Sequence, residues 1–318
     1  MSLANQAEPP IIAVVGPTAS GKSALGIELA LALNGEIINC DSVQVYREIE
    51  IATAKVPFAE RRGVPHHLID FVPPETNYTA GQWARAAVQK IREIEERGRT
   101  ALLVGGTGFY LRALREPFFV SPPTDEKLRR RLSDIREQRG TLYLHKLLKR
   151  LDPLSASRLY PRDWPRVQRA LEVCLQTGRS MTEQLPKRTA SPKEAARIRV
   201  IALNPLRAEL YARINRRTEE HFAAGLVEEV ERLLRRGVPA RSSALGAHGY
   251  RRVVEYLRGE RDLASAIERT KQDVRNYAKR QLTWFRRESG VQRFEGFGDD
   301  RQLQAHVLKV LVSEQESL

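Results

Sequence analysis

The sequence has few of the residues and patterns that build disulfide, zinc and membrane proteins. Its 318 residues include two cysteines, Cys40 and Cys174, which lie far apart and form no C-x-x-C pair. A disulfide framework or a zinc site is therefore not expected, and a reducing cytoplasm suits the chain best. No apolar run approaches the roughly 18–20 residues of a membrane-spanning helix, and the N-terminal stretch lacks the pattern of a secretory signal. We expect a cytoplasmic protein without a membrane partner.

Acidic residues are in the minority, and the resulting charge is unevenly distributed. The formal net charge is +14, from 53 Lys and Arg against 39 Asp and Glu. Residues 1–118 sum to −1, whereas residues 119–318 sum to +15. An arginine-rich, solvated surface would account for this in a chain of biased composition. The sharper interpretation is a polyanionic partner larger than a nucleotide, because a basic surface steers and holds nucleic acid.

A glycine-rich stretch near the N-terminus has the pattern of a phosphate-binding loop. It reads Gly-Pro-Thr-Ala-Ser-Gly-Lys-Ser, follows the apolar run Ile11–Val15 and precedes a stretch of helical character. Glycines let several backbone N–H groups point at one phosphate, lysine adds positive charge, and the serine hydroxyl can bind Mg²⁺. The positive end of the helix dipole favours the same anion. A tight turn without a ligand is the alternative. The predicted phosphate-binding residues are Gly16, Pro17, Thr18, Ala19, Ser20, Gly21, Lys22 and Ser23, with the metal at Ser23.

Two further strands are expected to end in polar turns. Asp41 follows the strand Gly35–Asn39, where open α/β sheets bind ligands. It could serve as a general base or as a turn aspartate. The strand Thr100–Val104 ends in Gly-Gly-Thr107, where a motor ATPase commonly has the Asp that holds Mg²⁺. This argues against a switch ATPase and favours a second phosphate-binding turn, with a threonine-capped turn as the alternative.

The middle of the chain predicts a separate helical unit. A proline-rich stretch is followed by helical segments in residues 119–194, which carry 17 basic and nine acidic residues. The strand Ile198–Leu203 then returns to the sheet. We therefore predict an α/β fold with a P-loop NTPase-like parallel sheet flanked by helices and an all-helical insertion. The core comprises residues 9–118 and 195–318, and the insertion comprises residues 119–194.

Basic residues recur at helical spacing in the C-terminal part. Arg213 and Arg217 are four residues apart on one helix face. Arginine forks suit phosphates, although an exposed basic face is the usual default. A longer helix places Lys271, Arg275 and Lys279 at the same spacing. That helix could be a core helix with a solvated face or could lie on a phosphate backbone.

Motifs spread over nearly the whole chain resemble the tRNA dimethylallyltransferases, also called tRNA isopentenyltransferases, of the bacterial type. The matching stretches are residues 16–23, 41–46, 53–55, 65–70, 103–110, 163–172, 213–217, 249–250 and 278–286. The resemblance implies transfer of the dimethylallyl group from dimethylallyl diphosphate to the exocyclic N6 amine of adenine at tRNA position 37, next to the anticodon, with Mg²⁺. The products are N6-isopentenyladenosine and diphosphate. Ala52 and His248 depart from the family pattern and put only local loop shape in doubt.

The resemblance also implies roles for individual residues. Asp41, Thr107 and Arg217 are implied to be catalytic, with Asp41 taking the proton of the amine. Dimethylallyl diphosphate would occupy the phosphate loop, and the tRNA anticodon stem-loop would be the macromolecular partner of a monomer. The implied tRNA contacts are Asp41, Ser42, Val43, Gln44, Thr107, Arg129, Pro165, Arg166, Val167, Gln168, Arg169, Gly246, Gly249, Tyr250, Arg251, Lys279, Arg280, Gln281 and Arg286.

Three other functions share some of these features. A P-loop small-molecule kinase would explain residues 1–118 but not the +15 beyond them. Prenyl transfer to free AMP or ADP would leave the helical insertion without a purpose. An RNA-binding ATPase switch would need the acidic residue that Thr100–Val104 lacks at its end.

Overall fold

The computed structural model describes residues 9–116, 122–184 and 191–316. The chain divides into two compact units. The first unit contains residues 1–115 and 192–318, and the second contains residues 116–191. The phosphate loop, Asp41 and Thr107 all belong to the first unit.

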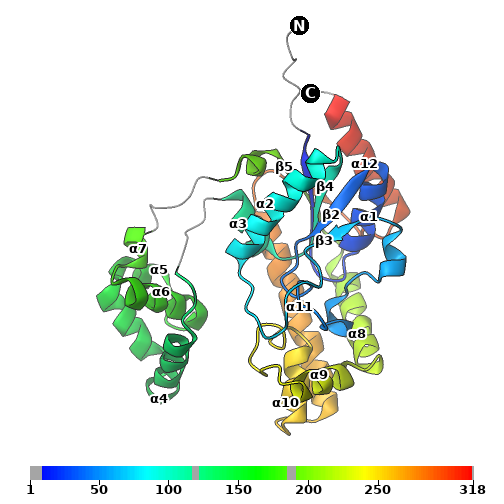
Figure 1. Cartoon of the computed structure of the whole chain (residues 1–318). Helices are drawn as coiled ribbons and strands as arrows, with labels where there is room; N and C mark the ends of the chain where they lie inside the picture. Colours follow the sequence, from blue (N-terminus) through cyan, green and yellow to red (C-terminus); the bar gives the residue numbers. More distant parts are fainter. Residues whose placement is uncertain (1–8, 117–121, 185–190, 317–318) are drawn as a thin grey trace. The chain divides into compact units, whose positions relative to one another are not determined.

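A six-stranded sheet with the order β3-β2-β4-β1-β5-β6 forms the centre of the first unit (Figure 1). Every pairing between neighbouring strands is parallel. β1 is buried along its whole length, as expected for a strand covered on both faces. The predicted parallel α/β sheet is therefore confirmed. The strands are β1 Ile11–Val15, β2 Gly35–Asn39, β3 His66–His67, β4 Thr100–Val104, β5 Ile198–Leu203 and β6 Val291–Phe294.

Helices cover both faces of this sheet (Figure 1). On one face, α1 (Lys22–Ala32) and α12 (Arg301–Glu316) bury apolar side chains against the strands. α2 (Ala80–Glu96) and α3 (Gly108–Arg115) pack together on the other face. A capping box at Thr79 satisfies the first amides of α2 and fixes where that helix begins.

Four more helices pack near the ends of the strands that carry the site. These are α8 (Arg207–Ala223), α9 (Leu226–Arg235), α10 (Tyr250–Leu257) and α11 (Leu263–Arg287). α8 and α11 share a small buried cluster with Phe297, and Ala19 of the phosphate loop packs against it. The loop is therefore supported by helices that are remote from it in sequence.

The second unit is entirely helical in its described part. It consists of α4 (Glu126–Leu151), α5 (Pro153–Arg158), α6 (Trp164–Thr177) and α7 (Met181–Gln184). Gly140 interrupts α4 with φ 77° and ψ 169°, so the helix runs as two segments on either side of it. Leu144, Leu148 and Leu171 are in the core of the unit.

Among the described residues, no helix combines the length and the apolar character needed to cross a membrane.

Candidate active site

The loop between β1 and α1 has the backbone conformation of a phosphate cradle. Gly16 and Gly21 have φ values of 147° and 81°, and Gly21 caps the N-terminus of α1. A Cβ on Gly21 would lie 2.7 Å from the backbone nitrogen of Asp299, so this position also needs glycine for close packing. The sequence order of strand, loop and helix is therefore realised at the edge of the sheet where ligands bind.

A C-terminal segment supports this loop from outside. The N–H of Gly298 donates to the carbonyl of Ser20 at 2.8 Å. Arg213 Nη1 donates to both carboxylate oxygens of Asp299, at 2.9 and 2.8 Å, and the guanidinium lies 3.7 Å from the ring centroid of Phe297. The guanidinium of Arg213 is thus engaged by side chains of the protein. This segment was not predicted from the sequence, where its closely spaced glycines at 296 and 298 were the available signal.

Arg217, one turn along α8, has no such carboxylate partner. It makes no hydrogen bond or ion pair with any described residue, and burial lowers its pKa. Burial also lowers the pKa of Lys22 to about 8, with the charge of Arg217 adding to this effect and that of Asp41 opposing it. Lys22 Nζ donates to the Pro17 carbonyl at 2.6 Å. The two cations therefore form a cluster of positive charge that Asp41 and Glu220 offset only in part, and a bound anion would neutralise it further.

His221 lies one turn after Arg217 on α8, and the positive charge of Arg217 acts on it. Its pKa is lowered to about 4 by burial and by the charge of Arg217. The imidazole is therefore neutral at physiological pH and adds no charge to the pocket. Its position was not predicted from the sequence.

Asp41 and Thr107 come together where β2 and β4 end. Asp41 Oδ1 accepts from the N–H groups of Val43 and Gln44 at 2.9 and 3.4 Å. The turn role considered for this aspartate is therefore present, but Oδ2 accepts no hydrogen bond from the described residues. Thr107 Oγ1 accepts from the Ser42 N–H at 3.0 Å. One carboxylate oxygen thus remains available beside a threonine hydroxyl.

The Gly105-Gly106 turn lets neighbouring loops approach closely. A Cβ on Gly105 would lie 2.1 Å from the Cys40 carbonyl oxygen. Gln281 Nε2 donates to the Gly106 carbonyl at 2.8 Å, and its Oε1 accepts from the Thr18 N–H at 2.8 Å. One side chain from α11 therefore ties the phosphate loop to the turn after β4.

Several implied tRNA contacts are buried. Val167 and Tyr250 are 0% exposed and Gln281 is 5% exposed, so none of these three side chains lies at the surface of the structure. Gln168 and Gly249 are buried as well. Val167 packs in the helical core, while Tyr250 and Gln281 hold backbone segments of the first unit.

Arginine residues of the helical unit are engaged internally. Glu172 is fully buried and pairs with Arg129 at 2.9 Å and with Arg169 at 3.0 Å. Both arginines neutralise this buried carboxylate. Their side chains nevertheless stay partly exposed to solvent. Pro165 and Arg166 are exposed at the start of α6.

On α11 the basic residues divide into two groups. Lys271 is buried and pairs with Glu219 and Glu268 at 2.6 Å each, and Arg275 donates to Asn215 at 2.6 Å. The charge of Lys271 is therefore taken up by carboxylates of the protein, and Arg275 is held by a side-chain amide. Lys279, Arg280 and Arg286 are exposed, as are Gly246 and Arg251 elsewhere.

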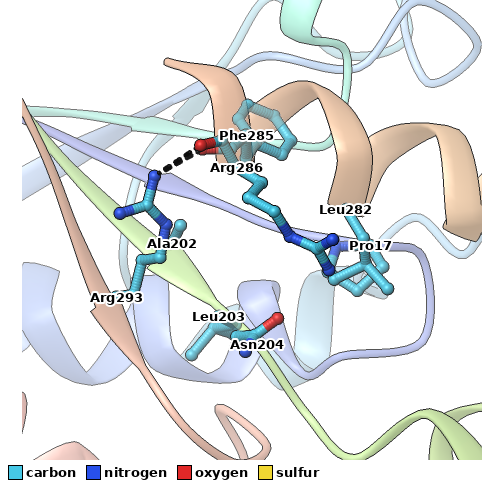
Figure 2. A pocket seen from close by; sticks show the side chains of 8 residues that line it. All are labelled: Pro17, Ala202, Leu203, Asn204, Leu282, Phe285, Arg286 and Arg293. Carbon is cyan, nitrogen blue, oxygen red and sulfur yellow. Dashed lines mark hydrogen bonds between the residues drawn. The ribbon is translucent and has the colours of Figure 1, made fainter. Parts of the chain in front are cut away.

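A small cavity lies beside the phosphate loop, at the end of β5 (Figure 2). Its volume is about 50 Å³, enough for a few water molecules and too small for a nucleotide or a prenyl diphosphate. In Figure 2 the side chain of Arg286 extends toward Pro17, while Arg293 bonds to backbone carbonyls of α11. The cavity contains neither Asp41 nor Lys22 and is not the reaction centre. Its lining residues are Pro17, Ala202, Leu203, Asn204, Leu282, Phe285, Arg286 and Arg293.

Known proteins resemble this chain over most of its length. A family profile described as IPP transferase matches residues 44–288. A tRNA dimethylallyltransferase of Solibacter usitatus is 47% identical over 290 residues, which cover 91% of this chain and 94% of the relative. The chain belongs to the IPP transferase family. The tRNA dimethylallyltransferase of Geobacter metallireducens is 46% identical over 88% of this chain and 91% of its own.

Solved structures of IPP transferases share the fold. The full-length tRNA isopentenylpyrophosphate transferase of Bacillus halodurans has a TM-score of 0.72 and 37% identity, covering 98% of both chains. A eukaryotic dimethylallyltransferase acting on tRNA has a TM-score of 0.72 and 29% identity, covering 90% of this chain and 74% of its own. The P-loop NTPase-like fold predicted from the sequence is thus confirmed for this IPP transferase.

Proposed function

We propose that this enzyme transfers the dimethylallyl group of dimethylallyl diphosphate to the exocyclic N6 amine of adenine at tRNA position 37. The observation that carries the proposal is that unlike groups lie close enough to act on one another's charge. Lys22 and Arg217 supply positive charge and make no ion pair among the described residues, and Asp41 has one carboxylate oxygen without a hydrogen bond. The cations suit a leaving diphosphate, and the carboxylate suits a proton acceptor.

In the proposed reaction, the bond between adenine N6 and the allylic carbon forms as the carbon–oxygen bond to diphosphate breaks. The electron pair of the broken bond leaves with diphosphate, and Lys22, Arg217 and the amides of the phosphate loop stabilise that charge. The N6 proton passes to Asp41, whose other oxygen is held by backbone amides. The Thr107 hydroxyl lies in the turn after β4, where it bonds to Ser42 next to Asp41, and it suits contact with a diphosphate oxygen.

The residues present fit a Mg²⁺ ion bound together with the diphosphate. Ser23 is the second residue of α1, and its hydroxyl makes no hydrogen bond to a described residue. Among the residues that the structure describes, no group of three or more His, Cys, Asp or Glu side chains could hold a metal ion without other ligands. Mg²⁺ commonly takes one or two protein ligands and completes its shell with phosphates and water. When bound, the ion would neutralise charge on the leaving group.

The proposed acceptor is the anticodon stem-loop, with the target adenine extruded from its stack. Lys279, Arg280 and Arg286 have no carboxylate partner in the described chain, so their charges are available to RNA phosphates. The exposed residues of the helical unit at the start of α6 are the proposed second contact. We propose that the enzyme acts in the cytoplasm as a monomer.

The test is direct. The protein is incubated with radiolabelled dimethylallyl diphosphate, Mg²⁺ and unmodified tRNA, and the labelled nucleoside is identified after digestion. Label in N6-isopentenyladenosine next to the anticodon is the expected result. A parallel incubation with labelled ATP and small hydroxyl acceptors tests the kinase alternative, which the relatives do not favour. Phosphorylation there, with unlabelled tRNA in the first reaction, would refute the proposal.

A further inference from the structure

The segment that follows β2 has an unusual backbone and little regular structure. Up to β3 it contains two short 3₁₀ helices, η1 (Ile51–Thr53) and η2 (Phe58–Arg61). Glu48 and Ala54 have φ values of 61° and 55°, and Leu68 and Asp70 in the neighbouring segment have φ values of 56° and 54°. These non-glycine residues adopt left-handed conformations that cost free energy and persist only where the surroundings hold them.

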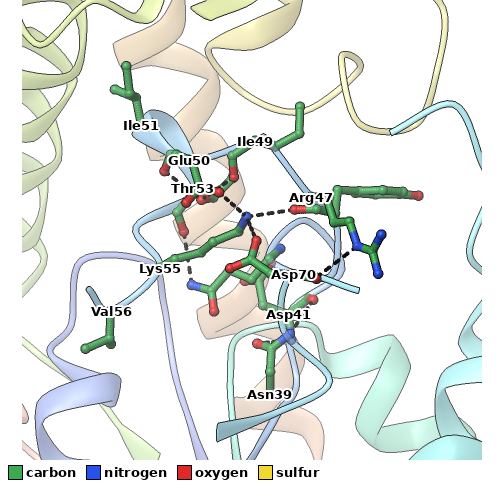
Figure 3. Close-up of polar contacts among 12 residues, drawn as sticks. Asn39, Asp41, Arg47, Ile49, Glu50, Ile51, Thr53, Lys55, Val56 and Asp70 are labelled. Atoms are coloured by element: carbon green, nitrogen blue, oxygen red, sulfur yellow. Dashed lines mark hydrogen bonds and ion pairs between the residues drawn. The ribbon is translucent and has the colours of Figure 1, made fainter. Parts of the chain in front are cut away.

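Lys55 is the centre of the contacts that hold this segment (Figure 3). Its side chain is 4% exposed. Nζ donates to the Tyr46 carbonyl at 2.7 Å and to Glu50 Oε1 at 3.2 Å, and it also pairs with the carboxylate of Asp70. An ammonium group has three N–H donors, so the three acceptors use its whole capacity.

The residues just before Lys55 fix the side chain of Gln44. Gln44 Nε2 donates to the carbonyls of Thr53 and Ala54, at 3.0 and 3.3 Å. Both amide hydrogens are therefore used, and Oε1 accepts no hydrogen bond from the described residues. The backbone carbonyl of Gln44 accepts from the Asp70 N–H at 3.1 Å. Lys55 thus joins the two stretches that together fix the orientation of this amide.

A second anchor holds the same segment on the other side. Glu229, on α9, accepts from the Glu50 N–H at 3.1 Å, and the Tyr250 hydroxyl accepts from the Ala52 N–H at 3.2 Å. Tyr250 in turn donates to Glu229 at 2.6 Å. With residues 50–52 fixed in this way, Thr53 is held by its hydroxyl, which donates to the Glu50 carbonyl at 2.8 Å, and the chain that follows is held by Lys55.

We propose that Lys55 is a positioning residue for the acceptor base. Through the Thr53 and Ala54 carbonyls it presents Gln44 Oε1 as a hydrogen-bond acceptor, close in sequence to Asp41, for an exocyclic amine. The exocyclic amine of adenine has two protons. Asp41 would take one of them, and the other would be hydrogen-bonded to Gln44 Oε1, which fixes the direction of the lone pair on this nitrogen. This inference rests on the proposed prenyl transfer to adenine.

The experiment compares single-turnover prenyl transfer in wild type, Lys55→Met, Gln44→Ala and the double variant, with both substrates saturating. Lys55→Met is expected to slow the reaction about 10- to 100-fold, because small misplacements of reacting groups cost this much. Affinities for tRNA and for dimethylallyl diphosphate should stay within about twofold of wild type. Since Lys55 acts through Gln44, the double variant should be at most about twofold slower than Gln44→Ala. Lys90→Met, which removes a partly exposed pair with Glu93 on α2, should behave as wild type.

Other outcomes overturn the proposal. They are a wild-type rate for Lys55→Met, rate losses that multiply in the double variant, or a loss of tRNA affinity as large as the loss of rate. If Lys55→Met shows no cooperative melting, Asp70→Asn replaces it in the same cycle and should give the same coupling to Gln44 with a smaller effect. An inactive wild-type protein would refute the proposed function itself, whereas an active wild type with an uncoupled Lys55 refutes only this inference.

Discussion

Replacing Arg217 by glutamine tests whether its unpaired charge serves the leaving group or the fold. An arginine whose charge stabilised the fold would have a carboxylate partner, as the partly exposed Arg213 has in Asp299. Arg217 has none in the described chain and lowers the pKa of nearby Lys22. We therefore expect Arg217→Gln to remove transition-state stabilisation while leaving the stability of the unliganded protein equal or higher.

The magnitude follows from the number of donors that remain. Loss of one preorganised donor to a developing anion typically costs about 10²- to 10³-fold in rate, or roughly 3–4 kcal/mol. Lys22 and the loop amides stay in place, so the variant should retain activity at about that reduced level. In the unliganded protein, Arg217→Gln removes the repulsion between Arg217 and Lys22 and breaks no ion pair.

The assay measures single-turnover prenyl transfer and urea unfolding for Arg217→Gln and for Arg216→Gln. Arg216 is a matched control on the same helix, because its side chain is 72% exposed and lies 3.7 Å from Glu220. The control should be neutral in both measurements. A clear loss of stability in Arg217→Gln with a rate close to wild type would refute our assignment of this residue.

Three further predictions concern the other parts of the site. Asp41→Asn retains an oxygen for the turn but loses the base, so prenyl transfer should fall about 10²- to 10⁴-fold while tRNA affinity is unchanged; weaker tRNA binding with normal single-turnover chemistry would contradict this role. Because the pKa of Lys22 is about 8 in the fold against 10.5 in the unfolded chain, the unfolded chain binds more protons between these values. Unfolding free energy should therefore rise with pH across that window by about 3 kcal/mol relative to Lys22→Met, and parallel pH profiles would disprove it. Joint replacement of Lys279, Arg280 and Arg286 by alanine should lower the slope of log affinity for tRNA against log salt by about 1 per lost phosphate contact. Lys271→Ala is the control, since its charge is paired, and an unchanged slope in the triple variant would exclude this surface.

Local patterns in the sequence were sufficient for the parallel sheet and the phosphate loop. The loop between Ile11–Val15 and the first helix is defined by adjacent residues, and so is the interruption at Gly140. Such features depend on backbone geometry within a few positions, which the sequence displays directly.

The roles of Arg213 and Arg217 could not be separated in the same way. Both occupy one helix face, and what distinguishes them is Asp299, 86 residues away from Arg213. Tyr250 and Gln281 were assigned to RNA by resemblance, whereas folding buries them against backbone groups from distant segments. Long-range pairing of polar groups is set by tertiary packing, which spacing along the chain does not encode.

The bridge made by Gln281 has a consequence for how α11 can behave. The amide nitrogen of Thr18 is already occupied by this side chain, so the cradle offers fewer free donors than its length suggests. Lys279 and Arg280 precede Gln281 on the same helix and face solvent. A tilt or shift of α11 would lengthen both hydrogen bonds of Gln281 at the same time. The distance between the phosphate loop and the turn after β4 therefore depends on the position of α11, whose exposed surface could contact RNA.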